Sequence, residues 1–424
     1  MTELFSGVYD YDGGPRVHHD GHLYYNPDIL REEYVIQSLP ESRQLDVTIS
    51  GGSMAGLFTA HALQQSGHNV DIYERTEYGK MQGRGGGIVP DPELFVYMEK
   101  HGLASRDEVS VVTDGIDYLD QDGSVRAHES GEIYSAGWDT FYVALRDAVG
   151  MDHYHMDRQV SSFEQANGGV TTTFQTGETV ESDLAISAEG YKSPTRQRLL
   201  PDVEMEYAGY LAWRGLLPQS DLPDDLAEYL GTTYVIYHGD DFQILTYPVP
   251  GADGSTEPGE RRVNLVWYQN VPEGEELDDL LLDKHGRQHE GSLPPGLLRE
   301  EARRRQERLA RERCPEPFVR YVESLPELYI QCIYDVKVPQ MVFDRTLILG
   351  DGAFFVRPHM AAGTSKAAAD GFRLAEAIST HEDLDAGLAD WEETQLELGH
   401  RLVDMARERG DRYMHRQSRP TQNP

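Results

Sequence analysis

The first regular pattern of apolar and polar positions begins at Leu45, after a stretch that shows neither a helical nor a strand period. Residues 45–50, LDVTIS, form a short β-prone run, and a glycine loop follows them. The next residues have helical spacing, which stops at Gly67. Residues 68–75, HNVDIYER, then give a second strand pattern that ends in an acid, Glu74. Together these patterns predict a strand–loop–helix–strand unit of about thirty residues.

The middle of the chain has a different texture. Residues 140–150, TFYVALRDAVG, predict a helix ended by glycine, and TTTFQ and DLAIS predict strands after it. Residues 207–270 then hold four β-branched or aromatic runs, YLAWRGLL, TYVIYH, FQILTYPV and RVNLVWY, separated by Pro, Gly and Asp turns. This texture predicts an antiparallel sheet that forms a layer separate from the first unit.

Helical patterns dominate the C-terminal part. Residues 272–325 are polar and helical, and REEARRRQERLARER within them is typical of a solvated helix face. Residues 345–351, RTLILGD, predict a short buried strand that meets a turn. Residues 363–378 predict a helix rich in small residues, and residues 388–410 predict one long amphipathic helix.

These elements predict an α/β fold of mixed α+β character. It combines a Rossmann-like dinucleotide-binding domain with an inserted antiparallel-sheet domain and a C-terminal helix. The expected division is an N-terminal extension at 1–43, a dinucleotide-binding domain at 44–200 and 335–385, an inserted domain at 201–334 and a C-terminal helix at 386–424.

The net charge of −35 is extreme, and the basic residues are 32 arginines against only six lysines. Acidic residues are spread over the whole chain. This distribution favours a protein that stays hydrated in a high-salt cytoplasm, where screening removes self-repulsion, over an acidic surface that recruits a basic partner. Since no basic stripe is available to neutralise phosphates, nucleic acid is not an expected partner.

The bulk composition indicates which broad class of protein this is: globular, membrane-spanning or secreted. A chain of 424 residues with 39% hydrophobic and 26% charged residues is typical of a globular protein of two or three domains. No apolar run approaches the roughly 18–20 residues that span a bilayer. The opening MTELFSG lacks the basic region and apolar core of a secretory signal, so the cytoplasm is the expected location.

A metal site is not expected. Cys314 and Cys332 lie 18 positions apart and form no C-x-x-C pair. The cluster HHDGH (His18, His19, Asp20 and His22) contains metal-binding side chains, but its spacing fits no defined site. A solvated or surface-draped extension is the favoured interpretation of this region.

The loop GGSMAG at 51–56 gives an imperfect G-x-G-x-x-G fingerprint. Gly51 fits the tight turn and Gly56 the close packing of helix on strand, whereas Ser53 replaces the middle glycine. Serine is the smallest replacement, and its hydroxyl can donate to a phosphate. Glu74 follows Gly56 by 18 residues, near the spacing of about 20 for a carboxylate that binds ribose hydroxyls. The alternative is a structural glycine turn in an α/β core.

Two further motifs carry chemistry. In LILGDGAFFVRPHMAAGTSKAAAD (347–370), Gly350-Asp351 places a carboxylate at the end of a strand, a position suited to a ribityl hydroxyl. Gly363-Thr364 then opens a helix whose free N–H groups face a developing anion. In DLAISAEGYKSPTRQRLL (183–200), a strand delivers Glu189-Gly190 into a loop.

With these motifs the chain resembles the single-component, FAD-dependent aromatic hydroxylases of the para-hydroxybenzoate hydroxylase fold. It is most similar to the 2,6-dihydroxypyridine 3-monooxygenase type. The matching segments span roughly residues 45–400 and are GGSMAGL, YER (73–75), RGGGIV (84–89), YAGYLAWRGLL (207–217), LVWY (265–268) and GDGAFFVRPHMAAGTSKAAAD (350–370). Within this family GGS is a common fingerprint. Glu189 departs from the family's Asp, and the added methylene can move the carboxylate by about 1 Å.

The resemblance implies a bound FAD that is reduced by NAD(P)H and reacts with O₂. A flavin hydroperoxide would then hydroxylate an electron-rich aromatic or N-heteroaromatic substrate. The helix that starts near Gly363 would stabilise negative charge on the reduced flavin by about 0.5–2 kcal/mol. The expected FAD-binding residues are Gly51, Gly52, Ser53, Met54, Ala55, Gly56, Glu74, Arg75, Arg84, Arg146, Glu189, Gly350, Asp351, Gly363 and Thr364.

The catalytic candidates are His359, Pro358 and His238, because a base or donor beside the flavin favours a phenolate-like substrate. The alternatives are that His359 only shapes its loop and that His238 lies at the rim. Tyr210, Arg214, His238 and His359 are the substrate-binding candidates. Tyr210 and Arg214 share strand parity, so they can face a ring or its carboxylate together; core packing and a surface ion pair are the alternatives.

Two other functions remain open at this point. One is an FAD-dependent reductase of the same fold that acts on isoprenoid double bonds, which would need a broad apolar cavity. The other is a catalytically silent flavin-binding sensor, which the departure at Glu189 supports. A flavin halogenase is not expected, since the chain has no W-x-W-x-I-P segment. The particular substrate, the choice of NADH or NADPH and the formation of a homodimer are left open.

Overall fold

The computed structural model describes residues 18–19, 22–23, 43–77, 79–81, 86–166 and 168–414. Of the expected N-terminal extension it therefore gives little more than two short strands, β1 (His18–His19) and β2 (His22–Leu23). The HHDGH cluster is not described as a whole. Among the described residues no group of three or more potential ligands is arranged to hold a metal ion.

The strand–loop–helix–strand unit expected from the sequence is confirmed as the centre of a six-stranded sheet in the described part of the chain. Five strands are parallel, and only the edge strand β19 is antiparallel to its neighbour. In spatial order the strands are β19 (Val342–Phe343), β20 (Thr346–Ile348), β12 (Leu184–Ser187), β3 (Asp46–Ser50), β4 (Asn69–Glu74) and β8 (Tyr154–Met156).

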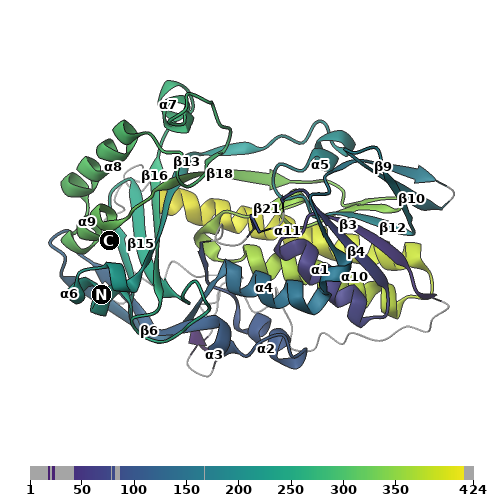
Figure 1. Ribbon diagram of the computed structural model, residues 1–424, viewed down its shortest axis with the longest axis horizontal. Coiled ribbons are helices and arrows are strands. Elements are labelled where there is room, and N and C mark those ends of the chain that lie inside the picture. Colours follow the sequence, from purple (N-terminus) through teal and green to yellow (C-terminus); the bar gives the residue numbers. More distant parts are fainter. Residues whose placement is uncertain are drawn as a thin grey trace, which may run out of the picture.

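Helices cover one face of this sheet (Figure 1). They include the predicted helix at 140–150, observed as α4, and the predicted small-residue helix, observed as α10. Small residues let α10 cross close to α1, because a Cβ at Gly371 would lie 2.6 Å from the Cα of Thr59. The helices on this side are α1 (Met54–Gln65), α2 (Pro92–Lys100), α3 (Arg106–Val109), α4 (Trp138–Val149) and α10 (Gly363–Thr380).

A small antiparallel sheet and a short helix complete this half. The sheet has three strands in the described residues, β9 (Val160–Ala166), β10 (Gly169–Phe174) and β11 (Thr179–Ser182). The short helix α5 (Pro194–Leu199) begins just after Glu189-Gly190.

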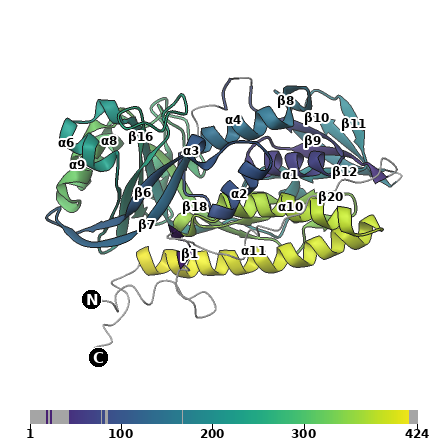
Figure 2. The same cartoon turned by 90° about the horizontal axis from the view of Figure 1, so that it is seen from below.

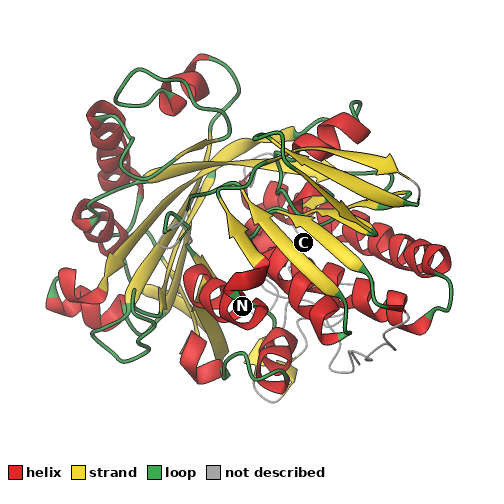
Figure 3. Ribbon diagram, turned by 45° about the vertical axis from the view of Figure 1, so that its right-hand side comes forward, coloured by secondary structure: helices red, strands yellow, loops and turns green. Residues whose placement is uncertain are grey.

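The four predicted antiparallel strands are also confirmed, and among the described residues they belong to a larger, mixed sheet of twelve strands in which two pairs are parallel. Figure 3 shows its long strands beside the helix-covered sheet. The strands, besides β1 and β2, are β5 (Gly87–Ile88), β6 (Ser110–Leu119), β7 (Val125–Gly137), β13 (Glu206–Pro218), β14 (Tyr234–His238), β15 (Phe242–Val249), β16 (Arg262–Asn270), β17 (Ser292–Leu293), β18 (Tyr329–Lys337) and β21 (Phe354–Phe355).

Four helices lie on the outer side of the large sheet (Figure 1). They are α6 (Asp224–Leu230), α7 (Glu275–Leu281), α8 (Glu300–Arg313) and α9 (Glu316–Ser324). Helix α8 is the predicted arginine-rich helix, and it buries only Ala302, Gln306 and Ala310, so its other face is solvated as expected.

Strands β6 and β7 were not predicted and lie in the large sheet, although their residues fall within the range 44–200 that the sequence assigned to dinucleotide binding. The cause is visible in β7, whose first residues are mostly polar and exposed or half-exposed. A strand of this kind lacks the apolar alternation by which strands are found.

Helix α11 (Leu384–Met414) is the predicted long C-terminal helix, extended at both ends. Figure 2 shows it running along both halves of the molecule, from the six-stranded sheet to the large sheet. No helix in the described ranges is long and apolar enough to cross a membrane.

The close crossing of α1 and α10 gives a stability test. Replacing Gly371 with alanine forces a methyl group against the Thr59 backbone, so the free energy of unfolding should fall by about 1–3 kcal/mol. Urea denaturation measures this change. The control Glu376→Ala, at an exposed site of the same helix, should stay within about 0.5 kcal/mol. Equal effects of the two substitutions would show that the helices do not pack this closely.

Candidate active site

A cavity of about 610 Å³ lies where the two large sheets meet. The loops after β3, β4, β12 and β20 line one part of it, and strands β13 to β16 line the other. Of the residues singled out in the sequence, those that line the cavity are Gly51, Ser53, Met54, Ala55, Glu74, Arg75, Glu189, Arg214, His238, Asp351, Pro358, His359, Gly363 and Thr364.

The glycine loop has the backbone that its sequence predicts. Gly51 has φ +108°, and a Cβ there would lie 2.2 Å from the carbonyl oxygen of Ala188. A Cβ at Gly56 would lie 1.9 Å from the Gly51 oxygen, so this glycine permits the contact between helix and strand. Ser53 is the N-cap of α1 and makes no side-chain capping hydrogen bond. The N–H groups at this helix start are therefore suited to a phosphate.

Glu74 holds the glycine loop as well as lining the cavity. Its Oε2 accepts the Gly52 N–H at 2.8 Å, and its Oε1 accepts the Thr76 N–H at 2.8 Å. A carboxylate has about four acceptor positions, so lone pairs remain for ribose hydroxyls. Behind the loop, the Tyr154 hydroxyl donates to the Gly52 oxygen at 2.7 Å, a contact that the sequence did not reveal.

The three arginines expected near FAD differ in position. Arg75 lines the cavity. Arg146 does not: its guanidinium pairs with Asp147 at 2.6 Å and lies over the ring of Tyr142. Arg84 lies outside the described residues.

The side chain of Glu189, which is one methylene longer than the family's aspartate, is bonded to neighbouring parts of the protein. Its carboxylate accepts hydrogen bonds from Ser50 Oγ (2.9 Å), Ser187 Oγ (3.1 Å), Ser193 Oγ (2.7 Å) and the Thr195 N–H (3.1 Å). These donors lie on β3, on β12 and at the start of α5, so one carboxylate joins three segments beside the cavity. The glutamate is thus a well-bonded part of the loop.

The turn after β20 depends on two buried charges that the sequence analysis missed. Asp370 Oδ2 accepts the Gly350 N–H at 2.8 Å, and Lys366 Nζ donates to both the Gly350 oxygen (3.0 Å) and Asp370 Oδ2 (2.7 Å). Both charged side chains are almost fully buried. Gly350 itself has φ +64° and lies tightly against Ala55. The two charges thereby fix the turn that presents Asp351.

Asp351 lines the cavity at this turn. Burial raises the pKa of its carboxyl to about 6, and the nearby Lys366 opposes that rise. The first turn of α10, with Gly363 and Thr364, lines the cavity next to it, and nothing lies within 4 Å of a Cβ built at Gly363. Carboxylates at Glu74 and Asp351, open helix starts at α1 and α10, and closely packed glycines between them fit a dinucleotide that carries a flavin.

The other part of the cavity is aromatic and contains one arginine. Tyr234, Tyr247 and Tyr268 come from neighbouring strands of the large sheet, and Tyr413 comes from α11. Arg214 donates to Gln331 Oε1 at 3.3 Å, and no carboxylate among the described residues pairs with it. Burial raises the pKa of Tyr268 to about 12 despite the charge of Arg214. This part of the cavity therefore suits a flat ring that carries an acceptor oxygen.

His359 lies between the two parts. Its Nε2 is 3.0 Å from the hydroxyl of Tyr210, and its ring contacts that of Tyr268 at a centroid distance of 4.3 Å. Burial, with the charges of Arg357 and Arg409, lowers the pKa of the imidazole to about 3, so the ring is neutral. Tyr210 is fully buried behind His359 and does not line the cavity, which differs from its expected contact with substrate.

The other two catalytic candidates also line the cavity. Pro358 begins the short 3₁₀ turn Pro358–Met360 that carries His359. His238 ends β14 and lies between the rings of Tyr118 and Tyr413, with centroid distances of 6.3 and 5.1 Å.

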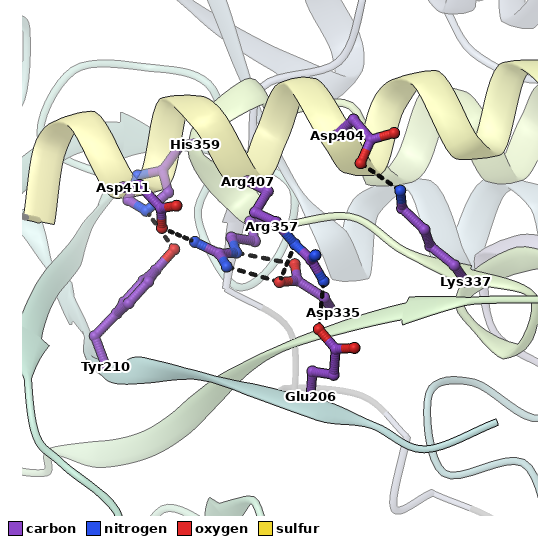
Figure 4. A network of polar contacts seen from close by, with 9 residues as sticks. All are labelled: Glu206, Tyr210, Asp335, Lys337, Arg357, His359, Asp404, Arg407 and Asp411. Atoms are coloured by element: carbon purple, nitrogen blue, oxygen red, sulfur yellow. Dashed lines mark hydrogen bonds and ion pairs between the residues drawn. The ribbon is translucent and has the colours of Figure 1, made fainter. Parts of the chain in front are cut away.

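A buried ion pair fixes the loop that carries His359 (Figure 4). Arg357 donates to both carboxylate oxygens of Asp335, at 2.9 and 2.7 Å, and both side chains are almost fully buried. Arg407 and Asp411 of α11 extend the network, pairing with Asp335 at 3.0 Å and with Arg357 at 2.8 Å. The loop, strand β18 and helix α11 therefore meet at one cluster of charges.

Comparison with known proteins gives consistent results. A model of the family "FAD binding domain-like" matches residues 207–335. The 2,6-dihydroxypyridine 3-monooxygenase of Paenarthrobacter nicotinovorans is 33% identical over 388 residues, which cover 89% of this chain and 94% of that protein.

Solved structures agree with this relation. The structure of 2,6-dihydroxypyridine-3-hydroxylase from Arthrobacter nicotinovorans matches with a TM-score of 0.82 at 32% identity, over 90% of this chain and 95% of that one. HpxO from Klebsiella pneumoniae, solved with FAD and uric acid, matches with a TM-score of 0.72 at 22% identity, over 87% of this chain and 89% of that one. The second likeness concerns the fold alone.

The buried pair of Arg357 and Asp335 predicts a large loss of stability when it is broken. Asp335→Ala leaves Arg357 without its main partner, so the free energy of unfolding should fall by about 3–5 kcal/mol. The control Asp404→Ala removes a carboxylate of α11 that is 63% exposed and pairs with Lys337, and it should cost at most about 1 kcal/mol. If urea denaturation shows that both variants lose a similar free energy of unfolding, the buried pair contributes no more to stability than the exposed pair.

The raised pKa of Asp351 predicts a pH effect in the flavin-free protein. Because the folded pKa of about 6 exceeds the unfolded value of 3.8, stability falls as pH rises through this window. Asp351→Asn should therefore raise the thermal midpoint at about pH 7.5, and the gain should shrink towards about pH 5. A gain that is the same at both pH values would mean that the carboxyl is not destabilised by burial.

Proposed function

Because this chain belongs to the single-component FAD-dependent aromatic hydroxylases, monooxygenases that use NAD(P)H and O₂, we propose that its substrate is a small hydroxylated aromatic or N-heteroaromatic ring. The ring would bind in the aromatic part of the cavity, against the flavin. The observation that carries this proposal is Arg214, a cation without a carboxylate partner in the described residues, placed among tyrosine rings.

The chemistry of that position defines the substrate class. Guanidinium N–H groups only donate hydrogen bonds, so a substrate that binds Arg214 must carry an acceptor. A phenolate-like oxygen or a carboxylate on the ring supplies one. Gln331, which already accepts from Arg214, has an amide that can also donate to the same ring. The rings of Tyr234, Tyr247 and Tyr268 supply flat apolar surface for the carbon skeleton.

FAD would be held at the other part of the cavity. Glu74 would bind the adenosine ribose, the loop 51–56 and the start of α1 the pyrophosphate, and Asp351 the ribityl chain. The start of α10 at Gly363 would stabilise negative charge at the flavin end of the cofactor. When bound, FAD supplies the electron transfer from NAD(P)H and the activation of O₂.

The protein's own contribution is to orient the ring and to set its charge. Arg214 would favour the ionised form of a ring hydroxyl, and a ring that carries an ionised oxygen is more electron-rich than the neutral ring. We expect His359, which is neutral, lines the cavity and lies next to Tyr268, to contact the same substrate. Tyr413 of α11 closes the aromatic part of the cavity on another side and helps to exclude water.

Two other functions are less well supported. A reductase acting on isoprenoid double bonds would use a broad apolar cavity, whereas this one contains Arg214, Gln331 and two histidines. The departure at Glu189 supports a silent flavin-binding sensor in the sequence, but in the structure that carboxylate accepts four hydrogen bonds and joins β3, β12 and the start of α5. The hydroxylase therefore accounts for more of the cavity than either alternative.

The proposal also covers the location, the oligomeric state and the domain boundaries of the enzyme. A net charge of −35 with few lysines supports a protein adapted to a high-salt cytoplasm, where screening offsets the repulsion. We also propose a homodimer as the working oligomer. The working domain boundaries are 44–200 with 335–385 and 201–334, except that β6 and β7 belong with the large sheet of the second domain.

A substrate screen tests the proposal. The FAD-loaded protein in about molar salt is mixed with NADH or NADPH and a panel of hydroxypyridines, nicotinates and salicylates, and both cofactor consumption and hydroxylated product are measured. At least one ring class should stimulate NAD(P)H oxidation and yield product. If no ring yields a hydroxylated product in high or low salt, the proposed substrate class is wrong.

His359→Ala should lower hydroxylation by about 10²-fold or more, since a positioned proton-transferring or donating group contributes about 10²–10⁴-fold. FAD affinity should change little, because His359 makes its polar contact to Tyr210. The measurements are product formed per NAD(P)H oxidised and a fluorescence titration with FAD. His128→Ala, at a surface histidine that pairs with Asp117, is the control. If His359→Ala forms as much product per NAD(P)H oxidised as the unaltered protein, His359 has no role in the reaction.

A further inference from the structure

Gln243 is a buried polar side chain in the aromatic part of the cavity. It lies on β15, is 4% exposed and lines the cavity. Its side chain makes no hydrogen bond to any residue in the described ranges. Both of its amide atoms keep accessible surface, in contrast to Nδ2 of Asn264 on the neighbouring strand, which is buried without a partner. The amide is therefore open to a molecule in the cavity.

The strand register places Gln243 on the same face of the sheet as Arg214. Arg214 on β13 lies directly opposite Val266 on β16, and Val266 lies directly opposite Leu245 on β15. Residues opposite one another share a face, and so do residues two apart on one strand. Gln243 is two positions from Leu245, so it points to the same side as Arg214. All four residues line the cavity, as this register requires.

The distance between Gln243 and Arg214 suits a single ring. Strand β16 lies between β13 and β15 (Figure 1), so the two residues are two strand spacings apart, about 10 Å, and two residues apart along the strands, about 7 Å. Their Cα atoms are therefore about 12 Å apart. Two hydrogen bonds of about 2.9 Å leave about 6 Å between the polar ends, which is the width of a six-membered ring with a substituent.

The side chains around Gln243 leave the amide as the polar contact at this end of the cavity floor. His238 and Tyr268 lie directly opposite it on the two neighbouring strands, and both line the cavity. Val266 and Leu245 form an apolar floor between the amide and Arg214. A ring that rests on this floor has a guanidinium at one edge and an amide at the other.

The amide offers a pair of groups that the guanidinium does not. Arg214 only donates, whereas Gln243 has an acceptor, Oε1, beside a donor, Nε2. A hydroxylated N-heteroaromatic ring in its lactam form carries an N–H and a carbonyl oxygen on neighbouring atoms, so its edge is complementary to the amide. A carbocyclic phenol has no such N–H. Two hydrogen bonds at this edge would therefore distinguish the two kinds of ring.

We propose that Gln243 is a specificity-determining residue that binds the nitrogen edge of a hydroxylated N-heteroaromatic ring. Its Oε1 accepts from the ring N–H and its Nε2 donates to the neighbouring oxygen, while Arg214 binds an oxygen on the other side of the ring. This assignment rests on the proposed function and narrows its substrate class. It also explains why a buried amide is left without a partner in the protein, since buried polar groups are nearly always hydrogen-bonded.

Binding of two matched probes tests the assignment. 2,6-Dihydroxypyridine and 1,3-dihydroxybenzene differ only in the atom between their two oxygens, which is nitrogen in the first and carbon in the second. Calorimetry with the FAD-loaded protein, without NAD(P)H, should show binding of the pyridine about 10-fold or more tighter than that of the benzene. Gln243→Met, which has similar length but no amide, should weaken the pyridine about 10-fold and the benzene less than about 3-fold.

Two results of this measurement would overturn the assignment. One is that the unaltered protein does not prefer the pyridine, or does not bind it. The other is that Gln243→Met keeps the preference of the unaltered protein. The control Gln306→Leu replaces a buried glutamine of α8 that does not line the cavity, and it should leave the binding of both probes unchanged.

Thermal unfolding of the FAD-loaded protein without a ring separates a binding role from a structural one. An amide without a partner gains no hydrogen bond on folding, so Gln243→Met and Gln243→Leu should keep or raise the thermal midpoint. FAD affinity should not change in either variant. If both variants lower the midpoint and weaken both probes equally, Gln243 has a structural role and the assignment is wrong.

The outcomes also separate this assignment from the proposed function. If Gln243→Met loses the preference for the pyridine but no ring is hydroxylated, the proposed function fails and the assignment of Gln243 stands. If a ring is hydroxylated and Gln243→Met keeps the preference, the proposed function stands and Gln243 does not determine its specificity.

Discussion

The ion pair between Arg357 and Asp335 is the interaction on which the arrangement of the site depends. Asp335 belongs to β18 of the large sheet, whereas Arg357 belongs to the loop that leads into α10, on the side of the six-stranded sheet. An unpaired charge at either position would be buried at a high cost, so the two halves are stable only when they meet there. Arg407 and Asp411 bring α11 into the same cluster. The position of His359 between the two parts of the cavity follows from this meeting.

Around the part of the cavity proposed for FAD, buried or half-buried carboxylates fix the backbone of the loops. Glu74 holds the Gly52 amide, Asp370 holds the Gly350 amide, and Glu189 holds the start of α5. Each carboxylate fixes a loop at the end of a strand, where the chain would otherwise have no regular hydrogen bonds. Preorganised loops of this kind leave helix starts and backbone amides exposed to a phosphate or a flavin without further rearrangement. The replacement of aspartate by Glu189 is accommodated because four donors, three serine hydroxyls and the Thr195 N–H, lie within its reach.

The sequence predicted the parts of this structure that depend on local pattern. The unit built from β3, α1 and β4, the helix α10 and the four long strands between 206 and 270 all follow from periodicity and glycine placement. The hairpin of β6 and β7 does not follow from such patterns, since half of β7 is polar and β6 enters the large sheet by pairing with β14, which lies far along the chain. Lys366–Asp370 and Arg357–Asp335 were missed for a related reason. A buried ion pair is defined by spatial neighbours, and a single charged residue in a sequence does not reveal whether it is buried.

If the flavin and the aromatic ring share one continuous cavity, a bound ring changes how the flavin reacts. Anaerobic mixing of the FAD-loaded protein with NADH or NADPH, followed through the flavin absorbance, tests this most directly. We expect 2,6-dihydroxypyridine or a related hydroxylated ring to accelerate the bleaching of the flavin. A bleaching rate that is the same with and without every ring tested, with either nicotinamide, would contradict it and favour a protein that binds flavin without hydroxylating a substrate.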